Sequence, residues 1–230
     1  MRTVFRWVFR LLLLALLAII LLVAHTILFK PLKPNWFYER VFIEFGAQDP
    51  QMLSSMRMLP SWMDWYSDDL TDQSLAQEKK MQAKLKADLA TLQKYDRASM
   101  NEADALNYDM LAYFLNMQAE GEKFNHHNYP LNQLFGIQNE FPTFMATQHP
   151  VESIKEAENY LARLDKVPVM VDQVMEGLLV REQEKIIPPT FVVEKVLKEM
   201  RTFVAADPKQ NILYTSLQEK FSELKKDQIS

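Results

Sequence analysis

The chain contains no cysteine and only four glycines in 230 residues. The lack of cysteine excludes disulfides, thiolate metal ligands, a cysteine nucleophile and a lipidated N-terminal cysteine, although it does not fix the redox compartment. Leucine, alanine, glutamate, lysine, glutamine and methionine recur instead, a composition that favours helix over sheet. We therefore expect an all-α protein, and its 48% hydrophobic residues are enough to bury one sizeable core.

The sequence also lacks the short motifs that usually mark a catalytic site. It has no glycine-rich phosphate loop, no G-x-S-x-G elbow and no helical His-Glu-x-x-His. His126 and His127 are adjacent, and because adjacent side chains point in different directions we interpret them as solvated loop residues. We expect His149 to complete a hydrogen bond at a helix entrance and the thirteen methionines to pack in the core. We predict no catalytic, metal or cofactor-binding residue in this chain.

The longest run without a charged residue lies near the N-terminus. Between Arg10 and Lys30 stands LLLLALLAIILLVAHTILF, and about twenty such residues span a bilayer as a helix. A cleavable signal peptide is the alternative, but its apolar core is usually shorter and ends in a small-x-small site, and no Ala-x-Ala lies near Ala24. We predict an uncleaved membrane anchor.

Charged and aromatic residues on either side of this run predict its orientation. Three arginines precede it and no acidic residue occurs before Glu39, so the positive-inside rule keeps the N-terminus cytoplasmic. Aromatic residues on both sides are expected at the lipid headgroups. The body would then be periplasmic, in a single-pass protein of the bacterial inner membrane. The predicted membrane-interface residues are Arg2, Arg6, Trp7, Arg10, Trp36 and Tyr38.

Acidic residues outnumber basic ones beyond the anchor. Residues 34–230 hold 21 basic and all 30 acidic residues, a net charge of −9. No basic stripe interleaved with aromatic residues is present, and phosphate would be repelled. Nucleic acid is therefore excluded as a partner, which leaves the lipid bilayer and other proteins.

Capping residues and apolar periodicity predict at least six helices after the anchor. Apolar residues recur at helical spacing, and we expect each set to form one buried stripe. We divide the chain into the anchor (1–33), a juxtamembrane linker with a short helix (34–60) and a helical domain (61–230). Helices are expected to start at Asp49-Pro50, Ser74, Ser99, Ser153 and Asp207-Pro208. The stripes are Met81-Leu85-Leu89-Leu92, Ala103-Leu106-Met110-Tyr113-Met117, Val167-Val171-Val174-Leu178, Val193-Leu197-Met200-Val204 and Leu213-Leu217-Phe221-Leu224.

The segment Tyr129–Pro150 is more apolar than its surroundings, yet it contains Gly136 and three prolines. These residues are expected to prevent one regular helix. Two interpretations are equally open. The apolar side chains either close the core of the helical region or line a channel that another part of the protein completes.

Several segments together resemble the N-terminal portion of the bacterial domain-of-unknown-function 885 family. They are Leu70–Ser74, Ala105–Leu111, the segment from Tyr129 with Asn159–Leu164, and Ile187–Val193. The resemblance implies an exported or membrane-anchored helical protein that looks like a zinc-dependent metallopeptidase. It also implies a metal motif, a His-Glu pair followed by Pro-Gly-His, in a C-terminal half. These 230 residues contain no such motif, so zinc is implied only for a full-length member.

Two classes of function follow. The first is the anchor and N-terminal helical part of a metallopeptidase-like hydrolase, completed by a C-terminal catalytic half or acting in a homo-oligomer. The second is a non-catalytic helical module, tethered to the membrane and used for binding or scaffolding.

Overall fold

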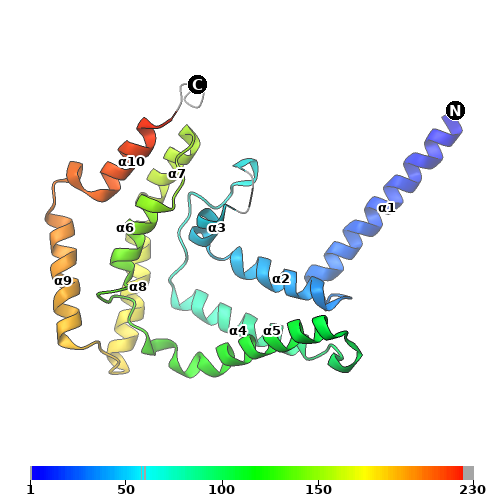
Figure 1. The fold of residues 1–230 in the computed structure, drawn as a ribbon, viewed down its shortest axis with the longest axis horizontal. Coiled ribbons are helices and arrows are strands. Elements are labelled where there is room, and N and C mark those ends of the chain that lie inside the picture. The colour runs from blue at the N-terminus through cyan, green and yellow to red at the C-terminus, as the bar shows by residue number, and fades with distance from the viewer. Residues whose placement is uncertain (1, 58, 60, 225–230) are drawn as a thin grey trace. The chain divides into compact units, whose positions relative to one another are not determined.

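The structure, a computed structural model, describes residues 2–57, 59 and 61–224, apart from the side chains of Arg2, Thr3 and Ser61. Within these ranges it is helical and has no strand, as the composition predicts (Figure 1). Short 3-10 helices connect some of the α-helices. The α-helices are α1 (Arg2–Leu28), α2 (Pro34–Gly46), α3 (Pro50–Met56), α4 (Leu75–Leu92), α5 (Glu102–Gly121), α6 (Ile137–Thr147), α7 (Ile154–Asp165), α8 (Val167–Gln183), α9 (Thr190–Ala205) and α10 (Ile212–Ser222).

Three of the predicted helix starts carry the expected cap. Asp49 accepts from the backbone N–H of Met52 before Pro50, and Ser74 and Ser153 accept from the N–H three residues on. Asp207 also caps, but it begins a 3-10 helix. The prediction at Ser99 is wrong. Asn101 caps α5 instead, because its side chain accepts from the N–H of Asp104 at 2.9 Å.

The chain folds into two compact units, each built from two stretches of sequence. Unit 1 comprises Met1–Phe45 and Gln82–Glu120, and unit 2 comprises Gly46–Met81 and Gly121–Ser230. The boundaries that we expect at residues 33 and 60 remain predictions, since compactness alone does not define a domain.

Unit 1 contains α1 and a small aromatic and aliphatic core. Phe37 of α2, Leu92 of α4 and Leu115 of α5 are completely buried there, and Tyr95 joins them. Among the described residues, one helix is long and apolar enough to cross a membrane, the part of α1 from Val4 to Leu28. Its length and composition fit a membrane span and a signal sequence alike.

Unit 2 has its core where α6, α7 and α10 meet. Phe141, Phe144 and Met145 of α6 pack with Tyr160 of α7, and Leu213 of α10 packs against this cluster. The Tyr160 hydroxyl donates to the Leu213 carbonyl at 2.9 Å. Burial of these large side chains is the main stabilising contribution to the unit.

The segment Tyr129–Pro150 is less broken than expected. The regular helix begins only after Gly136, which is the N-cap of α6. The chain needs glycine there, because a side chain would come within 2.6 Å of the Asn132 backbone. Pro142, however, lies inside the regular helix α6. The core interpretation is confirmed for some of its apolar residues, and the channel interpretation stays a prediction for others. Phe141 and Phe144 close the core, whereas Leu134 and Phe135 are 68% and 75% exposed.

The predicted stripes are only partly buried. Leu85, Leu89 and Leu92 of α4 pack in the core of unit 1, as expected. The prediction for α5 is wrong, because the predicted stripe faces outward and its four large side chains are more than half exposed. The core of unit 1 contacts another set of α5 residues, Tyr108, Leu111, Ala112 and Leu115. The α9 stripe also stays largely open, and Val192 and Val196 are the buried valines of that helix. The exposed α5 residues are Leu106, Met110, Tyr113 and Met117.

Candidate functional site

An apolar cleft opens between α8 and α9 of unit 2. It consists of two pockets of about 300 and 430 Å³. Leu131, Met175 and Met200 line both pockets, so the two are compartments of one space. We call it the α8–α9 cleft. Its volume lies in the range of sites that enclose small ligands or side chains.

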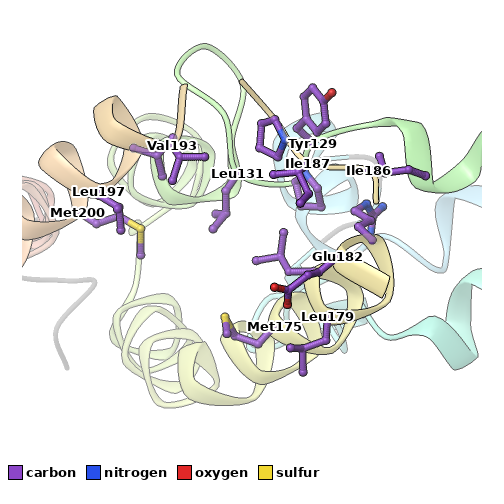
Figure 2. Close-up of a pocket in the computed structure, with 15 residues that line it drawn as sticks. Tyr129, Leu131, Met175, Leu179, Glu182, Ile186, Ile187, Val193, Leu197 and Met200 are labelled. Carbon is purple, nitrogen blue, oxygen red and sulfur yellow. The ribbon is translucent and has the colours of Figure 1, made fainter. Parts of the chain in front are cut away.

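Two facing helices provide the walls of the α8–α9 cleft. Figure 2 shows Met175 and Leu179 of α8 on one side and Val193, Leu197 and Met200 of α9 on the other. These residues belong to, or lie beside, the stripes that periodicity predicts to be buried. Each helix therefore has an apolar face that lines the open cleft and does not pack into the core. The pattern predicts the two faces, but it does not predict the space between them.

The prediction that the methionines pack in the core holds for only some of them, because others line the α8–α9 cleft. Met145 is completely buried and Met170 nearly so, as predicted, but Met175 is 49% exposed and Met200 38%. An unbranched, polarisable side chain adapts its shape to different occupants. The walls are thus suited to apolar groups of varied shape.

Polar side chains stand at both ends of the cleft. At one end, Arg181 donates to the Asn128 amide oxygen at 2.6 Å and to the Gly177 carbonyl at 3.0 Å. A side chain at position 177 would come within 3.0 Å of this guanidinium, so glycine leaves room for it. Burial lowers the pKa of Arg181. Glu182 lines the cleft beside it.

At the other end, Asn139 of α6 donates to the Glu199 carboxylate of α9 at 3.3 Å. Gln138 lies next to Asn139 in the lining. Amides and carboxylates at these positions offer hydrogen bonds to a polar chain that carries apolar side chains into the cleft.

A further hollow of about 360 Å³ adjoins α6 on unit 2. Its lining includes the exposed Leu134 and Phe135 together with Gln51 and Gln148. The Ser55 hydroxyl hydrogen-bonds to Gln148 at its border. This hollow is a depression of unit 2 with a mixed polar and apolar lining.

A buried arginine holds the elements around α6 in place. Arg163 of α7 is completely buried. Its guanidinium donates to the Ser54 hydroxyl at 2.8 Å, to the Asp69 carbonyl at 2.8 Å and to His149 Nδ1 at 2.6 Å. Burial lowers the pKa of Arg163 to about 10. This one side chain links segments that are about a hundred residues apart in sequence.

His149 takes the role that the sequence predicts, a hydrogen bond at a helix entrance. Its Nε2 lies 3.2 Å from the Glu156 carbonyl in the first turn of α7. Because that acceptor requires Nε2 to carry the proton, Nδ1 is free to accept from Arg163. Burial lowers the pKa of His149 to about 4. The imidazole is therefore neutral at physiological pH.

His126 is not the free loop residue that we expect. It lies in a 3-10 helix, Glu122–His127, and its Nδ1 is 2.7 Å from a Glu184 carboxylate oxygen. His127 instead meets the ring of Phe124 edge-on. Across residues 2–57, 59 and 61–224, no group of three histidine, aspartate or glutamate side chains is arranged to hold a metal ion.

The predicted membrane-interface residues lie in the N-terminal part of α1 and on α2. Trp7 is 59% exposed on α1, with the Arg10 guanidinium 5.6 Å from its ring, and Arg6 is exposed beside them. Trp36 is half-buried on α2, whereas Tyr38 packs against the core of unit 1. Burial raises the pKa of Tyr38. The side chain of Arg2 lies outside the described residues, and the interface assignment remains a prediction.

Comparison with known proteins identifies one relationship. None of the curated proteins and none of the solved structures matches the chain. A family model described as a bacterial protein of unknown function (DUF885) matches residues 50–229, which include α3 to α10 and the whole α8–α9 cleft. Because this match covers most of the chain, the protein belongs to the DUF885 family.

Proposed function

We propose that this chain is the membrane-anchored N-terminal helical part of a metallopeptidase-like hydrolase and is not catalytically complete by itself. The observation that carries the proposal is the α8–α9 cleft, an open apolar space with polar groups at both ends. In such an enzyme, the cleft would hold apolar side chains of a peptide substrate while a second helical half supplies the reacting groups.

Zinc, which the family resemblance implies for a full-length member, does not fit the residues that the structure describes. The part of the chain that the structure describes offers no set of three suitable side chains. A catalytic zinc site normally uses three protein ligands. We therefore derive no catalytic step through a metal from these residues.

The role of the chain's own residues is substrate binding. Complete burial of a leucine, methionine or phenylalanine side chain contributes about 1.5–3 kcal/mol. The walls formed by Met175, Leu179 and Leu197 would supply that burial. Asn139 and Glu182, at opposite ends, would orient the polar backbone of the peptide.

The proposed location is the bacterial inner membrane, with the N-terminus cytoplasmic and the body periplasmic. The length of the apolar part of α1 and the arginines near its N-terminal end support this. Leu17→Arg is expected to abolish membrane integration, since a charge near the bilayer centre costs about 2.5–3.5 kcal/mol on insertion scales. Leu17→Val is the matched control. Carbonate extraction of membranes measures the outcome, and full retention of the arginine variant would contradict a membrane span.

The decisive experiment on the enzyme proposal is to purify the native protein from its own membranes and measure its intact mass. The proposal predicts a mass well above 27.0 kDa, or stable association with a second, zinc-containing chain. The same preparation should cleave peptides with apolar side chains, and Met175→Lys should raise KM. A 27.0 kDa product that carries no zinc-containing partner and cleaves no peptide would exclude the hydrolase.

The second candidate function is a non-catalytic binding or scaffolding module. It is favoured by the outward-facing stripe on α5, where Leu106, Met110 and Tyr113 are 59%, 63% and 69% exposed. Exposed apolar patches of this kind mark contact surfaces. If this candidate is correct, Met110→Lys will break a complex in native membranes while Met175→Lys leaves it intact.

A further inference from the structure

The C-terminal end of α1 is capped by a side chain from α2. Arg40 Nη1 donates to the carbonyls of Thr26 at 3.0 Å, Ile27 at 3.3 Å and Phe29 at 2.8 Å. The last four carbonyls of a helix have no partner inside the helix, and a cation near them also interacts favourably with the helix dipole. Arg40 therefore joins α2 to the end of the proposed membrane span.

Two further side chains hold the residues that follow α1. The Tyr95 hydroxyl donates to the Pro31 carbonyl at 2.6 Å. Lys30 Nζ donates to the Lys94 carbonyl at 3.1 Å and lies 4.3 Å from the centre of the Tyr95 ring. Tyr95 itself packs against the buried Phe37. The exit from α1 is thus part of the core of unit 1 and not a loose tether.

The charge of the capping arginine is balanced inside unit 1. Arg40 Nη2 lies 4.0 Å from an Asp88 carboxylate oxygen, and Asp88 is 5% exposed. Lys84 pairs with the same carboxylate at 2.7 Å and also with Glu44. A paired, largely buried guanidinium keeps a fixed direction. The side of α2 that carries Arg40 is therefore held toward the end of α1.

Trp36 and Ile43 share that side of α2. Residues 36, 40 and 43 follow the i, i+4, i+7 spacing of one helix face. Ile43 is 64% exposed, and Trp36 has the Lys33 ammonium 5.6 Å from its ring. Phe45 is 50% exposed but points to nearly the opposite side, about 160° around the helix from Ile43 at 100° per residue. Phe45 can therefore serve as a control position on the same helix.

The length of α1, compared with the thickness of a bilayer, places this face of α2 near the lipid. The apolar part of α1 has 25 residues, about 37 Å at 1.5 Å per residue, and the hydrocarbon core is about 30 Å thick. Each interfacial layer adds only about 5–7 Å. A helix bonded through Arg40 to the last turn of the span stays within or beside that layer.

We propose that Trp36 and Ile43, which lie on the same side of α2 as the largely buried Arg40, rest on the lipid surface next to the exit of α1, which holds unit 1 against the bilayer at a fixed angle. Trp36 and Lys33 occupy the headgroup region, where tryptophan and lysine are favoured, and Ile43 reaches toward the acyl chains. This inference rests on the proposed membrane anchoring of the chain.

Nitroxide labelling of the full chain tests the proposal. The protein has no cysteine, so Ile43→Cys, Phe45→Cys and Leu17→Cys each give a single labelling site. The probe is the labelled full chain in phosphatidylcholine vesicles, with relaxation measured against oxygen, which concentrates in lipid, and against a water-soluble nickel complex. We expect a lipid-like signature at positions 17 and 43 and a water-like one at position 45.

The possible outcomes separate the anchor from the surface contact. A water-like position 43 with a lipid-like position 17 overturns this inference and leaves the anchor intact. A water-like position 17 overturns the anchor itself. Arg40→Met in the Ile43→Cys background should remove the lipid-like signature at position 43, whereas Arg97→Met should not. An unchanged signature in the Arg40→Met protein overturns the capping mechanism, provided that its circular dichroism shows intact helices.

Discussion

Each unit is organised around an arginine that donates to backbone carbonyls, and the two arginines are stabilised differently. Arg40 in unit 1 has carboxylates of Asp88 and Glu44 within 4.0 Å. Arg163 in unit 2 is completely buried, and its hydrogen bonds go to three carbonyls, one hydroxyl and one imidazole.

The difference shows two ways to keep a guanidinium out of water. In unit 1, opposite charge offsets much of the loss of hydration, at the edge of the core and next to the proposed membrane. In unit 2, the groups hydrogen-bonded to the cation are neutral, while the carboxylates of Asp64, Asp68 and Asp69 act on it without a hydrogen bond, and burial lowers the pKa of Arg163 to about 10. Since the hydrogen bonds of Arg163 are more deeply buried than those of Arg40, removing Arg163 should be the more damaging change.

The largest expected effect follows from Arg163→Met. The variant leaves the carbonyls of Pro50, Tyr66 and Asp69 without this donor in a buried site, and we expect the free energy of unfolding to fall by about 3–5 kcal/mol. Urea unfolding of the full chain in mild detergent measures it. Arg97→Met is the matched control, because its ion pair with Asp109 is exposed. Equal losses in the two variants would contradict a special role for Arg163.

The next effect is the pH dependence of unit 2. In the folded chain the pKa of His149 is lowered from 6.5 to about 4, so between these values the unfolded chain binds a proton that the folded chain does not. The contribution is fully present above pH 6.5 and is lost as the pH falls toward 4, by on the order of 3 kcal/mol.

The difference in unfolding free energy between the wild-type chain and His149→Gln separates the effect of His149 protonation from that of the carboxylates. Unfolding free energies of both proteins, measured from pH 7 to pH 4, should converge or cross as the pH falls. Parallel curves would mean that the imidazole is accessible to protons in the folded chain.

Arg40→Met should have a smaller effect than Arg163→Met. Its carbonyl partners lie in exposed or half-buried positions, and Lys84 still pairs with Asp88 after the change. Hydrogen bonds to charged groups contribute about 1.5–3 kcal/mol, which sets the expected loss. The same unfolding assay checks the ranking, and a loss greater than that of Arg163→Met would reverse the comparison between the units.

The smallest effect on stability is expected in the α8–α9 cleft. Met200→Gln changes a 38% exposed side chain that lines both compartments, so the unfolding free energy should change by no more than about 0.5 kcal/mol. Binding of an apolar fluorescent dye should nevertheless weaken several-fold. Met110→Gln on α5 is the control, and an equal loss of dye binding there would place the dye elsewhere.

Local signals in the sequence predict much of the fold. Asp49 and Ser153 cap the helices they are expected to cap, because a short side chain reaches its own backbone whatever the tertiary structure. Leu85 and Leu89 pack against the core of unit 1, as their helical spacing predicts. Ser99 does not cap α5 because the helix begins two residues further on than expected, where Asn101 accepts from the N–H of Asp104.

The site and the buried polar groups are harder to predict. Periodicity shows that Val193, Leu197 and Met200 share a face, but not whether that face meets a core or an open cleft. Arg163 appears in the sequence as an ordinary helical cation, since its partners Ser54 and Asp69 are about a hundred residues away. Only the folded chain brings such groups together. A signal was present in retrospect, because Arg163 lies between the apolar Tyr160 and Leu164 on the buried side of α7.

The division of each unit into two stretches has a consequence for the order of folding. Unit 1 begins with α1 and α2 but needs α5, which ends at Gly121, before its core can close. At roughly 5–20 residues per second, synthesis from Phe45 to Glu120 takes about 4–15 s. During that interval Phe37 and Leu92 have no completed core to enter, and the stretch Gly46–Met81 emerges before its own unit exists. The nascent chain therefore passes through a period in which the apolar side chains of the unit 1 core have not yet been buried.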